Sequence, residues 1–183
     1  MTSDGDNALD KLDEIDRALS DKIAALECGK ILESIIVVPT LMFSPIGIPL
    51  FIAVTILYFR SFGYLVSMLL GLVFSEGIKK IARRPRPQLQ SHKPFNITQH
   101  LMHVDSYSMP SGDSLQSAVF AVVVAYHLQL TQWSYIFIPW AAFGRVYWGN
   151  HWIGDTLAGA FIGFTASFII CMNFDDLLRH NFF

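Results

Sequence analysis

Cationic side chains and prolines cluster in the run Lys-Lys-Ile-Ala-Arg-Arg-Pro-Arg-Pro, residues 79–87, at the end of an apolar stretch. An arginine guanidinium binds phosphate oxygens through paired hydrogen bonds, and a lysine adds a point charge. Pro85 and Pro87 are expected to end a helix and to fix the backbone that follows it. The cluster therefore indicates either a phosphate-binding edge or a basic flank that sets membrane topology.

A second polar segment, residues 108–114, comes directly before a strongly apolar stretch. The free amides and the positive dipole end at a helix N-terminus both favour an anion. Gly112 would let an anion approach the backbone, and the hydroxyl of Ser111 would add a donor. The alternative is an ordinary helix cap made by Ser111 or Asp113.

The third segment, residues 144–155, leads into the last apolar stretch and contains His151 and Asp155. If this segment is helical, the two side chains lie four positions apart on one face. A carboxylate that accepts the proton of one imidazole nitrogen fixes the tautomer and leaves the other nitrogen able to attack. The alternative is a satisfied histidine–carboxylate pair that performs no chemistry.

In this order the three segments resemble the signature of the type 2 phosphatidic acid phosphatase (PAP2) superfamily, which includes vanadium haloperoxidases. The matches are Lys79 and Arg86-Pro87 to K-x6-R-P, Pro110-Ser111-Gly112 to P-S-G-H, and Arg145, His151 and Asp155 to S-R-x5-H-x3-D. The resemblance covers about residues 31–172. The short chain, the Arg-Arg-Pro-Arg-Pro run and the N-terminal segment are most similar to the polyisoprenoid or presqualene diphosphate phosphatase branch.

The resemblance implies a phosphatase in which His151 attacks phosphorus, forming a phosphohistidine, and Asp155 orients His151. It implies that the phosphoryl oxygens are held by Lys79, Arg86, Ser111, Gly112 and Arg145. It also implies that no metal or other cofactor is required. His92, His100 and His103 share one loop, but their spacing suits no standard metal site.

Two positions depart from the family pattern: Gly144 replaces a serine, and Asp113 replaces the second histidine. That histidine resembles a general acid for the leaving oxygen. An aspartate at a helix N-terminus is favoured as an anion that would repel phosphate, whereas burial favours its protonated form. The sequence leaves open which effect dominates, and Asp113 is expected to be a weak general acid at best.

A weak general acid bears on the substrate, because a phosphate leaving group needs a proton less than an alkoxide does. The expected substrates are therefore isoprenoid diphosphates such as farnesyl, geranylgeranyl or presqualene diphosphate. Two alternatives stay open. One is a monoester phosphatase for phosphatidate or sphingosine phosphate, and the other is a catalytically silent relative that binds lipid phosphate.

The composition places these segments in a membrane protein. Of 183 residues, 52% are hydrophobic and 15% are charged, against about 25% charged in a soluble domain. Only four acidic residues lie between Ser34 and Phe174. The expected partners are membrane lipid and a phosphorylated lipid substrate. Nucleic acid is not expected, because the basic run continues an apolar stretch with no soluble domain around it. Oligomeric state is left open.

The apolar stretches predict an all-α, integral-membrane bundle of five or six helices, similar to the PAP2 and haloperoxidase fold. Two short spans or a broken hairpin are expected in residues 31–59, which contain Pro39, Pro45 and Pro49. Further helices are expected in residues 61–82, 114–130, 133–147 and 156–172. Gly159, Gly163 and Ser167 are spaced four apart, which predicts close helix packing.

The N-terminal part differs from the rest of the chain. Residues 1–7 are expected to be disordered, and apolar residues that recur every three or four positions from Ala8 to Cys28 predict an amphipathic helix. It would lie flat in the membrane interface or pack on the rest of the protein. We therefore expect an N-terminal segment, residues 1–30, and a multi-pass membrane domain, residues 31–183. The membrane would be the endoplasmic reticulum in a eukaryote or the cytoplasmic membrane in a bacterium.

Overall fold

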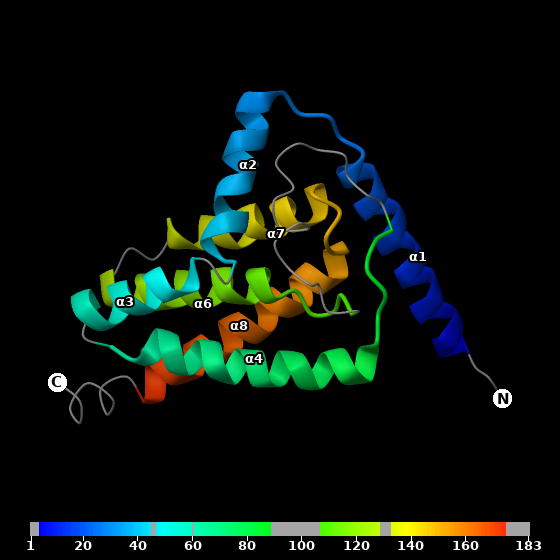
Figure 1. Cartoon of the computed structure of the whole chain (residues 1–183). Helices are drawn as coiled ribbons and strands as arrows, with labels where there is room; N and C mark the ends of the chain where they lie inside the picture. Colours follow the sequence, from blue (N-terminus) through cyan, green and yellow to red (C-terminus); the bar gives the residue numbers. More distant parts are fainter. Residues whose placement is uncertain (1–3, 45–46, 60, 89–106, 129–132, 175–183) are drawn as a thin grey trace.

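The apolar stretches of the sequence fold as helices. The computed structural model describes residues 4–44, 47–59, 61–88, 107–128 and 133–174. Its helices are α1 (Asp4–Ala24), α2 (Lys30–Met42), α3 (Ile48–Phe59), α4 (Gly63–Ala82), α6 (Gly112–Leu128), the 3-10 turn η1 (Ser134–Ile136), α7 (Phe137–Tyr147) and α8 (Ile153–Asn173) (Figure 1). Within these ranges no β-strand is formed, so the all-α fold class is confirmed.

The amphipathic helix α1 begins earlier and ends earlier than expected. Residues 4–7, which were expected to be disordered, are helical. The helix ends at Ala24 rather than Cys28. The backbone N–H of Cys28 instead donates to the hydroxyl of Tyr147 on α7, at 3.3 Å. That bond directs the chain toward the bundle.

The break expected within residues 31–59 is present, but Pro39 is not its cause. Pro39 lies inside α2, which continues to Met42, so the expectation that this proline interrupts the helix was wrong. Pro49 lies in the first turn of α3, where a missing backbone N–H costs no helical hydrogen bond. The result is two short helices, which is compatible with either alternative.

Small residues bring α6 and α8 into the most extensive helix contact of the bundle. A Cβ atom at Gly159 would collide with the carbonyl oxygen of Ser111, and one at Gly163 would collide with that of Leu115. Ser167 is buried, and its hydroxyl donates to the carbonyl of Gly163 at 2.6 Å. The close packing expected from this row is confirmed, and it holds residue 111 against the start of α8.

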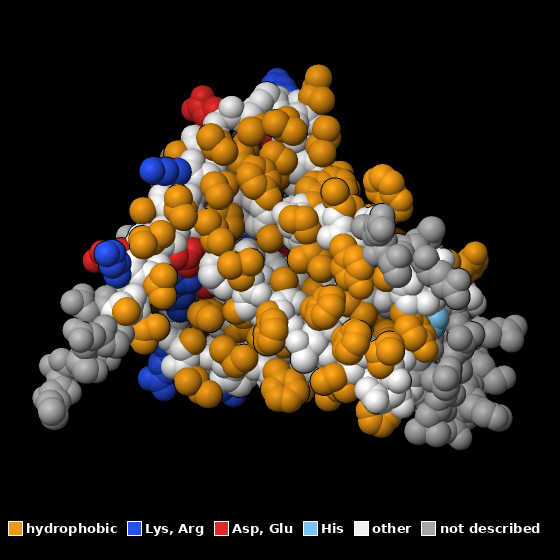
Figure 2. Space-filling view, turned by 180° about the vertical axis from the view of Figure 1, so that it is seen from behind, with side chains coloured by type: hydrophobic (Ala, Val, Ile, Leu, Met, Phe, Trp, Pro, Cys, Tyr) orange, Lys and Arg blue, Asp and Glu red, His pale blue; other side chains and the backbone are white. Residues whose placement is uncertain are grey.

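Much of the molecular surface is apolar. Figure 2 shows hydrophobic side chains over most of one face, with charged side chains gathered toward the end that carries α1. On α8 the large exposed side chains are Leu157, Phe161, Phe164, Phe168, Ile169 and Met172. Of the helices described, α8 is the one long and apolar enough to cross a membrane, with a mean hydropathy of 1.6.

The glycine contact between α6 and α8 can be tested with Gly163→Ala. The added methyl group meets backbone atoms of Leu115, so the helices must separate, and we expect a lower unfolding temperature in detergent. Gly77→Ala on α4 is the matched control, because a Cβ there meets no atom within 4 Å and alanine favours helix by about 1 kcal/mol. Equal unfolding temperatures for the two variants would contradict the close packing of Gly163 against the backbone of Leu115.

Candidate active site

The three motif segments meet at one end of the bundle. Lys79 lies in the last turn of α4, Ser111 directly precedes α6, and Arg145 lies in the last turn of α7. The backbone N–H of Ser111 donates to the carbonyl of Asp155 at 2.9 Å, which joins the second segment to the third. Arg86 donates to the carbonyl of Asn150 at 3.0 Å, which joins the first segment to the third.

His151 is buried between a guanidinium and a carboxylate. Its Nε2 atom lies 3.2 Å from Nη1 of Arg86, and its Nδ1 atom lies 3.6 Å from Oδ2 of Asp155. A guanidinium can only donate, so Nε2 is the acceptor and the ring proton belongs on Nδ1, facing the carboxylate. The lone pair of Nε2 therefore points toward the cationic side of the site.

The environment of His151 keeps the imidazole neutral. Burial lowers the pKa of His151, the nearby Asp155 carboxylate opposes that change, and the charges of Arg145 and Arg86 lower the pKa further, to about 3. Near neutral pH the ring is therefore an uncharged base with an available lone pair. That is the form a nitrogen nucleophile requires.

Asp155 is fully buried in the first turn of α8, with a partner for each oxygen. Oδ2 accepts from the backbone N–H of Trp152, and Oδ1 accepts from Nη1 of Arg84, both at 2.9 Å. His151 precedes the N-cap residue Trp152, so the condition that residues 151 and 155 share one helix face is not met. The two side chains face each other because the chain turns into α8 at this point.

Arg84 is a residue that sequence reasoning missed. It belongs to the basic run, but the family motif drew attention to Lys79 and Arg86 instead. Its side chain is 12% exposed and contacts carboxylates from two different helices. The signal available in the sequence was an arginine next to Pro85 with no assigned role.

Asp113 and Arg145 form an ion pair, with 3.0 Å between Oδ2 and Nη1. Burial raises the pKa of Asp113, and the charges of Arg145, Arg86 and Lys79 oppose that rise without cancelling it. Lys79 additionally pairs with Glu76 at 2.8 Å. In this arrangement the Asp113 carboxyl is paired with a guanidinium, which favours its charged form, whereas its burial favours the protonated form.

Ser111 and Gly112 form the start of α6. The hydroxyl of Ser111 is buried and lies 3.2 Å from the Ser114 hydroxyl and 3.5 Å from its backbone nitrogen. This is the geometry of a helix cap, which was the alternative weighed for this segment. A Cβ at Gly112 would meet no atom within 4 Å, so the space beside this backbone is open.

The replacement of the usual serine by Gly144 has a packing reason. A Cβ at this position would lie 3.0 Å from Oγ1 of Thr40 and 3.2 Å from the carbonyl of Ile36, both on α2. A serine would push α2 away from α7. The second departure, Asp113, has no comparable steric cause.

The histidines at positions 92, 100 and 103 lie outside the described residues. Within the described ranges, no group of three or more His, Cys, Asp and Glu side chains is arranged to hold a metal ion.

A helical bundle that gathers these three segments around a buried histidine–aspartate pair defines the PAP2 class of fold. A family model of the PAP2 superfamily matches residues 60–178, and the chain belongs to this superfamily. The superfamily resemblance of the sequence is thereby confirmed. A search of curated proteins finds no significant match.

Two solved structures are similar to this chain. LpxE from Aquifex aeolicus has 20% identity and a TM-score of 0.67, and the match covers 86% of this chain and 94% of that one. The first transmembrane PAP2-type phosphatidylglycerolphosphate phosphatase from Bacillus subtilis has 22% identity and a TM-score of 0.70, with coverages of 91% and 87%. At these identities the likeness shows the fold.

The burial of neutral His151 predicts a specific acid sensitivity. Its folded pKa of about 3 lies below the ordinary value of 6.5, so its contribution to stability is complete above pH 6.5 and is lost as the pH falls toward 3. At pH 5 the loss is about 2 kcal/mol. Denaturant unfolding at pH 7 and pH 5 should therefore show a smaller decrease for His151→Gln than for the unmodified chain. Equal decreases would show that the pKa of the imidazole is the same in the folded and unfolded chain.

Proposed function

We propose that this protein is an integral-membrane lipid phosphatase that hydrolyses isoprenoid diphosphates through a phosphohistidine intermediate. The observation that carries the proposal is the position of Nε2 of His151. It is a neutral acceptor 3.2 Å from Arg86, with Asp155 on the opposite side of the ring. A phosphoryl group bound by Arg86 would place its phosphorus next to this lone pair.

The proposed reaction has two displacements. The lone pair of Nε2 forms a bond to the terminal phosphorus, and the bond to the leaving oxygen breaks with its electron pair. Asp155 stabilises the positive ring through the proton on Nδ1. A water molecule then attacks the phosphohistidine, which releases inorganic phosphate and restores the neutral ring. Guanidinium and lysine groups supply the positive charge that stabilises the transferring phosphoryl group, so no metal is required.

The pairing of Asp113 with Arg145 supports a diphosphate substrate. An ion pair with a guanidinium favours the ionised carboxylate, which is a poor proton donor, and burial of Asp113 opposes this effect. An alkoxide leaving group depends on such a donor, whereas a prenyl phosphate leaves as a stable anion. The site is therefore better suited to cleavage between two phosphates than to cleavage of a phosphate monoester.

The apolar surface supports placement in a membrane with several spans. Exposed large hydrophobic side chains extend along α8 and also occur on α2, α3 and α4. The apolar residues of α1 line one wall of a groove of about 860 Å³, facing Ala82 and Leu157. We place α1 at the membrane interface with this apolar edge toward lipid, and residues 31–183 in the membrane.

The second candidate is a phosphatase for a phospholipid monoester. The structural neighbour from Bacillus subtilis is a phosphatidylglycerolphosphate phosphatase, which keeps this substrate class open. The third candidate, a silent lipid-phosphate binder, draws support from Asp113. A binder has no use for a histidine held by a carboxylate, so phosphate release separates these candidates.

Phosphate release from a substrate panel tests the proposal directly. Purified protein in detergent should release phosphate from farnesyl diphosphate faster than from farnesyl monophosphate or phosphatidate, in the presence of EDTA and with inhibition by vanadate. His151→Ala should abolish release, because the nucleophile is gone. The matched control is His127→Ala, a histidine at the distant end of α6. Faster release from phosphatidate would favour the second candidate, and no release from any lipid would favour the third.

Substitutions of Asp113 separate its effect on phosphate binding from its effect on proton donation. Asp113→Asn removes the competing charge from Arg145, so the vanadate inhibition constant should fall several-fold while kcat changes little. Asp113→His adds a proton donor as well, so kcat for farnesyl monophosphate should rise about tenfold or more, and kcat for the diphosphate should rise less. Equal kcat values for both variants on the monophosphate would place residue 113 outside the proton path.

A further inference from the structure

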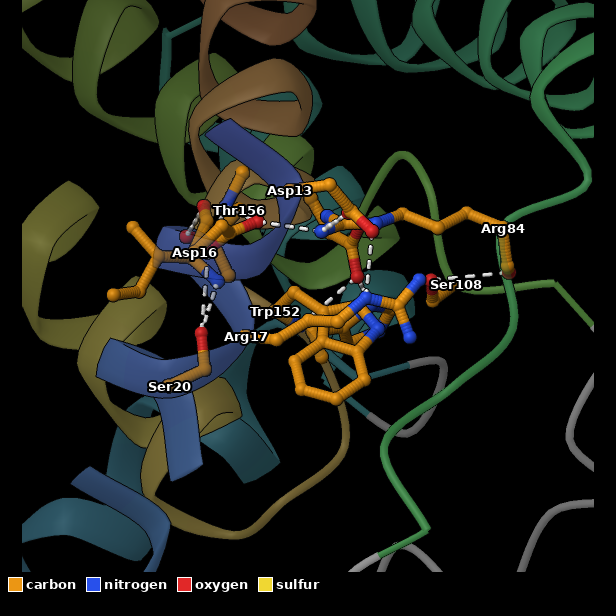
Figure 3. Close-up of polar contacts among 12 residues, drawn as sticks. Asp13, Asp16, Arg17, Ser20, Arg84, Ser108, Trp152 and Thr156 are labelled. Carbon is orange, nitrogen blue, oxygen red and sulfur yellow. Dashed lines mark hydrogen bonds and ion pairs between the residues drawn. The ribbon is translucent and has the colours of Figure 1, made fainter. Parts of the chain in front are cut away.

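The polar side chains of α1 face the active-site end of the bundle. Figure 3 shows Asp13, Asp16 and Ser20 of this helix pointing toward Arg84 and the start of α8. Ser20 is buried and Asp16 is half-buried, although α1 lies at the edge of the molecule. The polar face of α1 therefore packs inward, while the apolar side chains Leu9, Leu12 and Leu19 remain exposed.

Arg84 connects α1 to the carboxylate that orients His151. Its Nη1 donates to Asp155 at 2.9 Å, and its Nη2 donates to Asp16 at 2.7 Å and also to Asp13. Partial burial raises the pKa of Asp13, but its bonds with Arg17 and Arg84 outweigh that effect and lower the pKa. Three carboxylates thus surround one guanidinium, which keeps Arg84 from turning toward a substrate phosphate.

The same face of α1 also caps α8. The backbone N–H of Ile153 donates to the hydroxyl of Ser20 at 2.9 Å, and that of Gly154 donates to both carboxylate oxygens of Asp16 at 3.1 Å. The first amides of a helix have no partner within the helix and need an external acceptor. Here the acceptors come from a helix more than 130 residues away in the sequence.

Trp152 strengthens the junction between these parts. The guanidinium carbons of Arg17 and Arg84 lie 5.0 Å and 5.7 Å from the centre of its ring. Its indole N–H donates to the carbonyl of Pro85 at 2.8 Å, next to Arg84. The residue between His151 and α8 is therefore held by α1 and by the proline-rich loop together.

We propose that α1 is a positioning element of the active site, which holds Asp155 in place through Arg84 and fixes the first turn of α8 through Asp16 and Ser20. The proposal rests on the phosphatase function above and names the segment on which its geometry depends. Arg84, Asp16 and Ser20 are positioning residues, because they act through Asp155 and the backbone at residues 153–154. Without them Asp155 would keep only its bond to Trp152, and the imidazole would lose its fixed orientation.

The first test compares Arg84→Gln with Arg83→Gln, which removes the same charge one residue away. Arg83 is exposed and its side chain donates to the carbonyl of Lys80, so its loss should leave activity within twofold. Arg84→Gln should lower kcat about tenfold to a hundredfold with little change in KM, a smaller loss than removal of the orienting carboxylate itself. Arg84→Lys should retain more activity than Arg84→Gln, because lysine keeps the positive charge. It should not reach full activity, because lysine lacks the two guanidinium nitrogens that bind separate carboxylates.

The pH profile separates positioning from a general loss of folded protein. The charged groups that face His151 are Arg86, Arg145 and Asp155. Arg84→Gln leaves the charge of Asp155 uncompensated by Arg84, so the imidazolium becomes more stable. In the pH profile of kcat, the loss of activity on the acid side should then begin at a higher pH. A variant that only lowers the amount of folded protein would leave that pH unchanged.

The second test measures amide exchange and needs no substrate. The double variant Asp16→Asn with Ser20→Ala should speed hydrogen exchange at the amides of residues 153 and 154 by at least about tenfold. Asp10→Asn, on the exposed side of α1, is the control and should leave both amides protected. Unchanged exchange in the double variant would overturn the proposal, even if the protein proved inactive on every lipid.

The two tests also distinguish this proposal from the proposed function. Activity in the unmodified chain together with equal kcat values for Arg84→Gln and Arg83→Gln would overturn the positioning role alone. Inactivity on the whole lipid panel together with rapid exchange in the double variant would overturn the phosphatase function and leave the structural role of α1 intact.

Discussion

A carboxylate that is fully buried in an apolar bundle needs a partner for each oxygen, because an unpaired buried charge is strongly destabilising. Asp155 meets this need with the backbone of Trp152 on one oxygen and with Arg84 on the other. Its neighbour Arg84 must in turn be held, and α1 supplies two carboxylates for that purpose. The orientation of His151 thus depends on a chain of charges that reaches from α8 to the N-terminal helix.

Backbone packing supplies the second constraint. Gly159 and Gly163 allow α6 to approach α8 so closely that the amide of Ser111 reaches the carbonyl of Asp155. Any side chain at either glycine would separate the two helices, and the second motif would leave the third. The glycines lie one and two turns from Asp155, so a contact made for packing also sets the distance between the two halves of the site.

The motif segments could be located from the sequence, because the chemistry of phosphate binding limits which side chains occur at which spacing, and the roles of their residues stay predictions. The sequence was also sufficient for the small-residue row on α8, whose packing follows from residue size. It did not predict the role of Arg84, since the partners Asp13 and Asp16 lie about 70 residues away and no periodic pattern links them. Nor did it predict that Pro39 stays helical, because the tertiary packing of α2 outweighs a local helix-breaking tendency.

The two arginine–carboxylate contacts of the site have different consequences for an incoming phosphate. Arg84 is paired with three carboxylates, which more than balance its single positive charge, so that charge serves the protein itself. Among the described carboxylates Arg145 is paired with Asp113, and a phosphate can compete for it. That competition depends on the charge of the ligand. A diphosphate carries about one negative charge more than a monoester and spreads its charge over more oxygens, so it displaces Asp113 more readily. Under the proposed function, the aspartate would both weaken proton donation and discriminate against weakly charged substrates, and both effects would favour the same class of lipid.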